Sequence, residues 1–104
     1  MITIEIKKEP LRIVSRGHAT GAGLAGANLV CCAVSTLLYT LLSAAEDIGA
    51  LSAVSLADGS MDITMEPGER AACMVHTVVT GLESLAAQYP AYITIKKERT
   101  HGGA

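Results

Sequence analysis

Residues 17–35, GHATGAGLAGANLVCCAVS, place a histidine and two adjacent cysteines within one short stretch. A cysteine thiolate is a strong nucleophile, and an imidazole within reach can take the thiol proton and carry the resulting positive charge. His18 and Cys31 are thirteen residues apart, and the glycine-rich segment between them allows the chain to fold back. The two residues are therefore a candidate pair for nucleophilic thiol catalysis.

The position of Cys31 in its helix bears on this chemistry. We expect a helix from about Leu29 to Ala45, because Asn28 is a good N-cap residue. Cys31 would then lie in the first turn, where free N–H groups and the helix dipole stabilise a thiolate and can donate to an oxyanion. The alternative is that Cys31 is a small core residue and His18 a loop histidine, which the spacing alone does not exclude.

Residues 21–26, GAGLAG, match the dinucleotide-binding pattern G-x-G-x-x-G. In the dinucleotide fold the last glycine lies inside the helix, whereas a helix capped by Asn28 begins after all three glycines. The acidic residue expected about 20 positions later would be Glu46 or Asp47, at a helix end rather than a strand end. We therefore expect no nucleotide cofactor at this loop.

The remaining chemistry-bearing residues form no second site. Cys32 lies about a hundred degrees around the helix from Cys31, so we expect it in the core. We expect Cys73 to be a packed thiol and His76 a surface or hydrogen-bonded histidine. No spacing matches a zinc motif, and neighbouring cysteines cannot form an unstrained bridge, which disfavours a redox sensor. No serine lies in a nucleophile elbow, so we expect neither a metal nor a serine hydrolase.

The composition indicates one compact domain that does not bind nucleic acid. The chain has 104 residues, half of them apolar, which is enough for a single core. A net charge of -2 and the absence of Phe and Trp leave neither a basic surface nor stacking rings for nucleic acid.

The start MITIEIKKEP alternates apolar and polar residues, unlike a signal peptide. Three cysteines, two of them adjacent, make a poor disulfide framework, so we expect a reduced, cytoplasmic protein.

Residues 19–45 contain no charged side chain, a run long enough to cross a bilayer. Glycines in its first third each weaken a helix by up to about 1 kcal/mol relative to alanine. The remaining helix of roughly 14 to 18 residues suits a core helix better than a membrane span. We expect no membrane segment, and a helix that is apolar nearly all round must be wrapped by other parts of the protein.

Alternation, helical spacing and turn residues predict seven elements that position the candidate pair. They are strands at 1–8 and 11–15, the helix at about 29–45, a hairpin of strands at 51–57 and 61–66 joined by Asp58-Gly59, a helix at 69–88 and a strand at 91–97. The order β-β-α-β-β-α-β indicates an α+β fold with two helices packed on a mixed sheet of about five strands.

The same pattern predicts how the chain is organised. We expect one domain over residues 1–97 and a flexible tail at 98–104. A sheet of this size has open edges, so we also expect a homodimer that covers them.

The string G-H-A, a glycine-containing spacer and N-L-V-C-C-A-V-S resembles the signature of the ribosomal-processing cysteine protease family called Prp. The family signature is similar to G-H-A, a spacer and D-[IV]-V-C-A-A-x-S. The resemblance of this chain to the family extends to chain length and to the order of the elements. By this resemblance Cys31 is the nucleophile and His18 the general base. Gly17 matches the glycine before the histidine, and Ser35, one turn after Cys31, could reach the active-site network.

The resemblance implies a function, and this sequence departs from the family signature at two points. It implies a cytoplasmic cysteine endopeptidase, without a cofactor, that removes the N-terminal extension of large-subunit ribosomal protein twenty-seven. A basic substrate suits a mildly acidic enzyme. Asn28 stands where the family has an aspartate, although amides orient histidine in some thiol proteases. The spacer is one residue longer, and we expect it to be mobile and to close over substrate. The alternative is a non-catalytic ribosome-assembly or protein-binding factor of the same fold.

Overall fold

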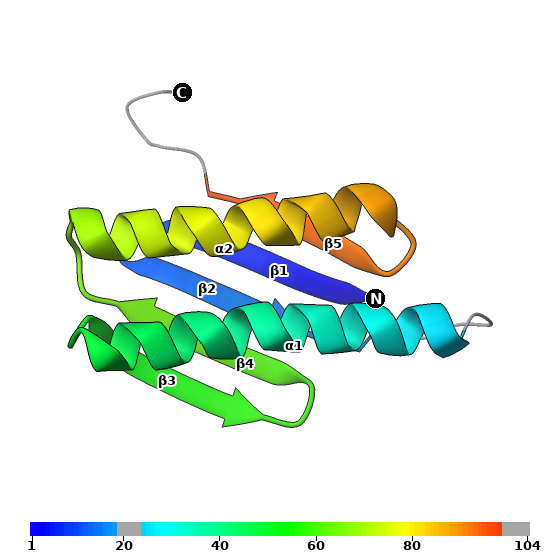
Figure 1. Ribbon diagram of the computed structural model, residues 1–104, viewed down its shortest axis with the longest axis horizontal. Helices are drawn as coiled ribbons and strands as arrows, with labels where there is room; N and C mark the ends of the chain where they lie inside the picture. Colours follow the sequence, from blue (N-terminus) through cyan, green and yellow to red (C-terminus); the bar gives the residue numbers. More distant parts are fainter. Residues whose placement is uncertain (19–23, 99–104) are drawn as a thin grey trace.

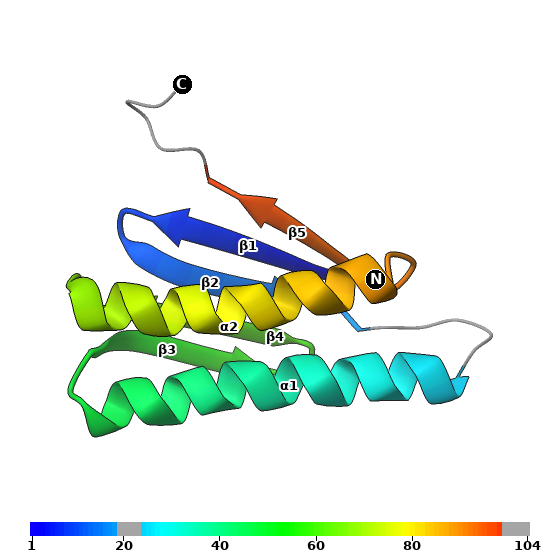
Figure 2. The same cartoon turned by 45° about the horizontal axis from the view of Figure 1, so that its top comes forward.

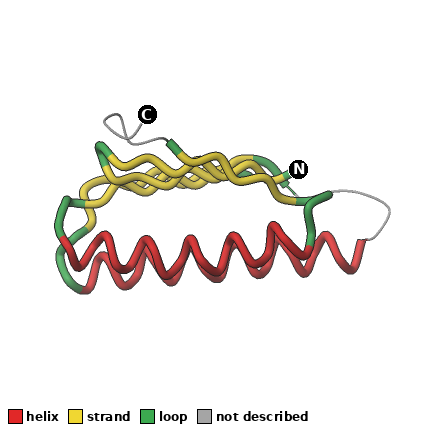
Figure 3. Tube along the Cα trace, turned by 90° about the horizontal axis from the view of Figure 1, so that it is seen from above, coloured by secondary structure: helices red, strands yellow, loops and turns green. Residues whose placement is uncertain are grey.

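The protein folds as two helices on one face of a five-stranded sheet (Figures 1 and 3). The structure is a computed structural model that describes residues 1–18 and 24–98, with the side chains of residues 24–27 left out. The elements in chain order are β1 (Ile2–Lys8), β2 (Leu11–Arg16), α1 (Leu24–Asp47), β3 (Leu51–Ala57), β4 (Ser60–Met65), α2 (Glu69–Gln88) and β5 (Ile93–Lys97). This order and architecture confirm the predicted α+β fold.

The sheet runs in the order β3-β4-β2-β1-β5. β1 pairs with β5 in parallel, and the other neighbours are antiparallel, so the sheet is mixed as predicted. Two hairpins supply the first four strands, and α2 carries the chain over to the parallel strand β5. The turn of the second hairpin is Asp58-Gly59, and Gly59 has a φ of 71°, which favours glycine.

The core lies between the sheet and the two helices, which run side by side across it (Figure 2). Alternate strand residues and one side of each helix supply it, as periods of 2 and 3.6 residues require. Fully buried side chains come from every layer: Ile4, Ile13, Val30, Leu38, Leu41, Ile63, Met65, Leu82 and Ile93. Each one stabilises the fold by about 1.5–3 kcal/mol relative to an exposed side chain.

Helix α1 is longer than the sequence predicted. It begins at Leu24 instead of near Leu29 and has 24 residues, so Gly26 and Asn28 lie inside it. The predicted start was wrong because glycine propensity is a local cost of up to about 1 kcal/mol, which tertiary packing commonly overrides. The segment between His18 and Cys31 was predicted to be a mobile loop, but its residues from Leu24 onward belong to α1. The rest of that loop, residues 19–23, and residues 99–104 of the predicted tail lie outside the described part of the chain.

The expectation that other parts of the protein would wrap this helix was also wrong. Among residues 28–47 of α1, the fully buried side chains lie on one side, at Val30, Val34, Leu38, Leu41 and Ala45. By length and composition alone, the stretch Asn28–Asp47 could cross a membrane, with a mean hydropathy of 1.7 and 28% of its window buried. A core helix passes the same test, and the buried side of α1 contributes to the core cluster.

Candidate active site

A cavity of about 390 Å³ opens between α1, the β3–β4 turn and the adjoining ends of β1 and β2. These segments meet at the end of the sheet near the N-terminus (Figure 1). The lining residues come from four separate parts of the chain: Ile2, Ser15, Gly17, His18, Cys31, Val34, Ser35, Leu38, Tyr39, Ala57, Asp58, Gly59, Ser60 and Met61. The cavity therefore gathers most of the residues that the sequence had singled out, namely Gly17, His18, Cys31 and Ser35.

His18 reaches the cavity because it lies two residues after the end of β2. Arg16 at the end of β2 pairs with Ser60 of β4, and the N–H of Gly17 donates to the Gly59 carbonyl at 2.8 Å. The backbone nitrogen of Met1 donates to the carbonyl oxygen of His18, also at 2.8 Å. The main chain is thus fixed on both sides, while the imidazole is exposed at the cavity wall.

Cys31 comes to the same cavity from α1. Its side chain is half-buried and packs against the core cluster. Ser35 lies one turn later, exposed at the cavity wall. A helix places residues i and i+4 on one face, so the thiol and the hydroxyl share one side of α1. His18 lines the same cavity from the segment that follows β2.

The helix start changes the environment expected for Cys31. Cys31 is the eighth residue of α1, counted from Leu24, so it lies beyond the first turn. Its backbone N–H falls within the intrahelical hydrogen-bond ladder, because only the first four N–H groups of a helix lack such partners. The prediction of a first-turn thiolate with helix-terminal oxyanion donors was therefore wrong. Asn28 is exposed inside the helix and does not cap it, and it is not among the described residues that line the cavity.

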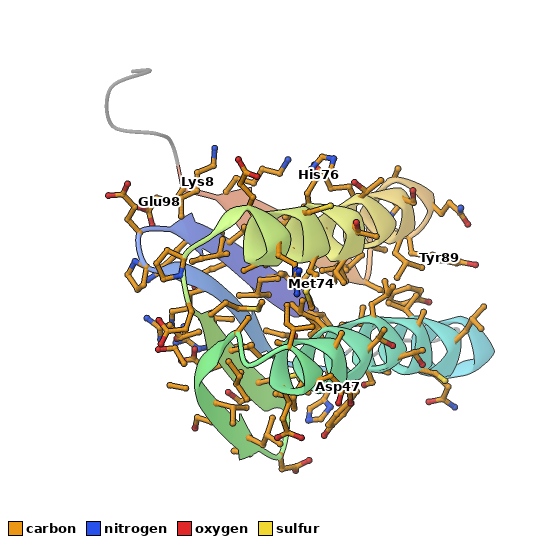
Figure 4. All side chains as sticks on the ribbon, turned by 60° about the vertical axis from the view of Figure 1, so that its left-hand side comes forward. Lys8, Asp47, Met74, His76, Tyr89 and Glu98 are labelled. Atoms are coloured by element: carbon orange, nitrogen blue, oxygen red, sulfur yellow. The ribbon has the colours of Figure 1, made fainter. Side chains whose placement is uncertain are left out.

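The other cysteines are exposed. Cys32, expected in the core, and Cys73, expected to be packed, both lie at the surface. The prediction failed for Cys32 because α1 is covered on one side only. His76 lies at the surface of α2, as predicted (Figure 4). Among residues 1–18 and 24–98, no group of three or more His, Cys, Asp or Glu side chains is arranged to hold a metal ion.

The β3–β4 turn is the part of the site that sequence reasoning missed. Asp58, Gly59 and Ser60 line the cavity, and the ring of His18 lies against Gly59. The Asp-Gly pair signalled a hairpin turn but not its neighbours in space. Only the pairing of β2 with β4 brings this turn beside His18, and strands distant in sequence give no local signal of such pairing.

A bidentate ion pair between Arg12 and Asp62 lies on the sheet face that the helices leave open. The guanidinium of Arg12 donates to both carboxylate oxygens of Asp62, through Nε at 2.8 Å and an Nη at 2.5 Å. The hydrogen bond from Arg12 lowers the pKa of Asp62, although partial burial opposes this shift. The same bond raises the pKa of Arg12. This pair joins β2 to β4, the two strands that bring His18 beside the β3–β4 turn.

Solved structures share this fold. The ribosomal processing protease Prp from S. aureus, described as essential and in complex with a substrate peptide, matches with a TM-score of 0.81 and 20% identity, over 94% of this chain and all of that chain (100%). The same protease with a covalently linked product peptide gives a TM-score of 0.80, again at 20% identity over 94% and 100% of the two chains. SMU.848 from Streptococcus mutans gives 0.73 and 26% identity, over 95% of this chain and 93% of its own.

No curated protein sequence matches the chain. The sequence model of the family described as Cysteine protease Prp, however, matches residues 1–94. This range contains both helices, the first four strands and the cavity. The chain therefore belongs to the cysteine protease Prp family.

Proposed function

We propose that this protein is a cysteine endopeptidase in which Cys31 is the nucleophile and His18 the general base. The observation that carries the proposal is the single cavity to which two separate segments bring these side chains, in a member of a cysteine protease family. A thiol and an imidazole at one solvent-accessible wall are the minimum that nucleophilic thiol catalysis requires.

The proposed reaction proceeds in two steps. The imidazole of His18 takes the proton of the Cys31 thiol, and the thiolate attacks the carbonyl carbon of the scissile peptide bond. The tetrahedral intermediate collapses, the C–N bond breaks, and the imidazolium gives its proton to the leaving amine. Water then attacks the thioester while His18 takes a proton from it, and the S–C bond breaks to release the acid and restore the thiol.

Three further residues have supporting roles in this proposal. The hydroxyl of Ser35 is placed to hydrogen-bond to a substrate held beside Cys31, since both line the cavity. Gly17 allows the close approach of β1, because a Cβ there would lie within 2.4 Å of the Met1 carbonyl oxygen. Asn28 lies three residues before Cys31 on the same side of α1, where its amide would act on the imidazolium only after substrate binding brings them together.

The proposed substrate is the N-terminal extension of large-subunit ribosomal protein twenty-seven. The S. aureus structures support a peptide substrate of this class, because that relative is a ribosomal processing protease with a bound substrate peptide. A net charge of -2 suits a basic ribosomal protein. We also propose that the enzyme works in the cytoplasm as a homodimer, without a cofactor and without direct contact with nucleic acid or membrane.

Cleavage of the extended ribosomal protein, followed by mass spectrometry, tests the proposal. Wild type, Cys31→Ala and Cys32→Ala should be compared, because Cys32 is a neighbouring thiol on the exposed side of α1. We expect one cut that Cys31→Ala abolishes and Cys32→Ala retains. No cut by folded wild type, even on peptides that span the extension, would contradict this substrate and favour a non-catalytic assembly or protein-binding factor.

A further inference from the structure

We propose that Gly59, at the β3–β4 turn, is a positioning residue for His18. Its missing side chain leaves the space that the imidazole ring occupies at the cavity wall. This inference rests on the proposed function, in which His18 is the general base for Cys31. It assigns a role in the site to a residue on a hairpin that supplies neither of the reacting side chains.

The contact between the two residues is close. A Cβ atom added to Gly59 would lie 2.5 Å from Nε2 of His18, 3.1 Å from Cδ2 and 3.3 Å from Cε1. Non-bonded carbon atoms have an optimal separation of about 3.5–4.0 Å, so a Cβ at position 59 would be too close to the ring. All three atoms belong to the outer part of the ring, so the tip of the imidazole rests on Gly59.

The backbone on both sides of this contact is held in place. The N–H of Gly17 donates to the carbonyl of Gly59, and the backbone nitrogen of Met1 donates to the carbonyl of His18, each at 2.8 Å. The adjoining pair Arg16 and Ser60 belongs to the β2–β4 ladder. A side chain at position 59 would therefore displace the ring of His18 before it displaced the main chain.

A side chain at position 59 would disturb the candidate active site rather than the fold. The imidazole is exposed, so it can turn away into solvent without opening the core. The fold would survive this movement, but the ring would leave the position from which it serves Cys31. Misplacement of a catalytic group by about 1 Å can lower a rate about a hundredfold.

A second explanation for Gly59 is its backbone conformation, since a φ of 71° favours glycine in any turn. Gly49, between α1 and β3, separates the two explanations. It has a φ of 69°, and a Cβ added there would meet no atom within 4 Å. Gly49→Ala therefore carries the backbone strain without the contact, and is the matched control for Gly59→Ala.

The test measures how fast iodoacetamide alkylates Cys31 between pH 5 and 9, followed by peptide mapping. Wild type, His18→Ala, Gly59→Ala and Gly49→Ala are compared, and the Tm of each is recorded. At pH 6 we expect alkylation of Cys31 in Gly59→Ala to be at least about tenfold slower than in wild type, approaching the rate in His18→Ala. Gly49→Ala should stay within about twofold of wild type while it loses a similar amount of Tm.

The outcomes distinguish this inference from the function on which it rests. Wild-type reactivity in Gly59→Ala, together with slow reaction in His18→Ala, would overturn the role of Gly59 alone. Equal profiles in wild type and His18→Ala would overturn the Cys31–His18 pair and, with it, the role of Gly59. Gly59→Asn repeats the test with less strain, because Asn tolerates left-handed backbone. If neither Gly59 variant folds while Gly49→Ala does, the glycine serves the fold and the inference is wrong.

Discussion

Cys31 and Cys32 are neighbours in sequence but lie in different surroundings. Cys31 is half-buried at the cavity wall, whereas Cys32 is exposed and its carbonyl accepts a hydrogen bond from the hydroxyl of Thr36 at 2.8 Å. The rotation of about 100° per helical residue separates the two thiols. Their chemistry therefore depends on which side of α1 each one occupies, and only Cys31 shares a cavity with His18.

Residue chemistry identified the candidate pair from the sequence, but the predicted start of the helix was wrong. Histidine before a glycine-rich segment and cysteine after it suggested a thiol site, and the cavity brings these side chains together. The supposed N-cap, Asn28, lies inside a helix that begins at Leu24. Capping preference is a weak local signal of about 1 kcal/mol, and the packing of a whole helix outweighs it.

The location of Asn28 leads to a prediction about the family's aspartate. We expect Asn28→Asp to change kcat/KM by less than about fivefold, because an exposed charge pair contributes at most about 1 kcal/mol. The measurement is steady-state cleavage of the extended ribosomal peptide, with Asn28→Ala as the control that removes the amide without adding charge. A gain of more than tenfold in Asn28→Asp alone would show that the carboxylate reaches the imidazolium in the substrate complex.

The elements were predicted better than their boundaries. Alternation and the Asp58-Gly59 turn located both hairpins, and the predicted second helix at 69–88 has the bounds of α2. The start of α1 was missed by about five residues, and the last strand begins at Ile93 rather than at residue 91. The order of strands in the sheet could not be predicted, because pairing between β2 and β4 joins segments about fifty residues apart.

The orientation of α1 predicts unequal costs for two leucines on the same helix. Leu41 is 1% exposed and Leu29 is 56% exposed. We expect Leu41→Ala to lower the free energy of unfolding by about 2–5 kcal/mol, because it leaves a cavity in the core. Leu29→Ala, the matched control, should change it by less than about 0.5 kcal/mol. Urea denaturation measures both, and equal losses would contradict the packing of α1 on the sheet.

The ion pair between β2 and β4 predicts how stability depends on pH. The pKa of Asp62 in the folded protein lies below its ordinary value of 3.8, because Arg12 stabilises the carboxylate. At a pH between the folded pKa of Asp62 and its ordinary value, the unfolded state binds more protons than the folded state. The pair therefore stabilises the fold above about pH 4. This contribution is lost as the pH falls through the folded pKa of Asp62.

The variant Asp62→Asn tests this dependence. We expect it to lower the Tm at pH 7 by less than about 5 °C, since the pair is only partly buried. The difference from wild type should shrink towards pH 2, where both chains lack the charge. Glu5→Gln is the control, because the bond from Arg16 to Glu5 is 3.5 Å long and exposed. A Tm difference that persists unchanged at pH 2 would show that packing, rather than charge, accounts for the loss.

Across the whole molecule, the helices do not cover all of the apolar surface. On β3, Val54 pairs with the buried Ile63 and Leu56 with Met61, so both face the helix side of the sheet. They remain 43% and 50% exposed because β3 is an edge strand beyond the cover of α1. Edge strands with exposed apolar side chains readily pair with another chain. Self-association was predicted from the open sheet edges, and we propose this surface of β3 as the interface.

The dimer prediction is tested by the mass of the protein in solution. We expect light scattering after size exclusion to give about twice the chain mass of 10.7 kDa at micromolar concentration. Leu56→Lys should shift the protein towards monomer, because it places a charge in the apolar surface at the β3 edge. Ser55→Lys is the matched control, since Ser55 is exposed on the same strand but points to the opposite face. A monomeric wild type would contradict the dimer, and equal dissociation by both variants would mean that the helix-side surface of β3 is not the interface.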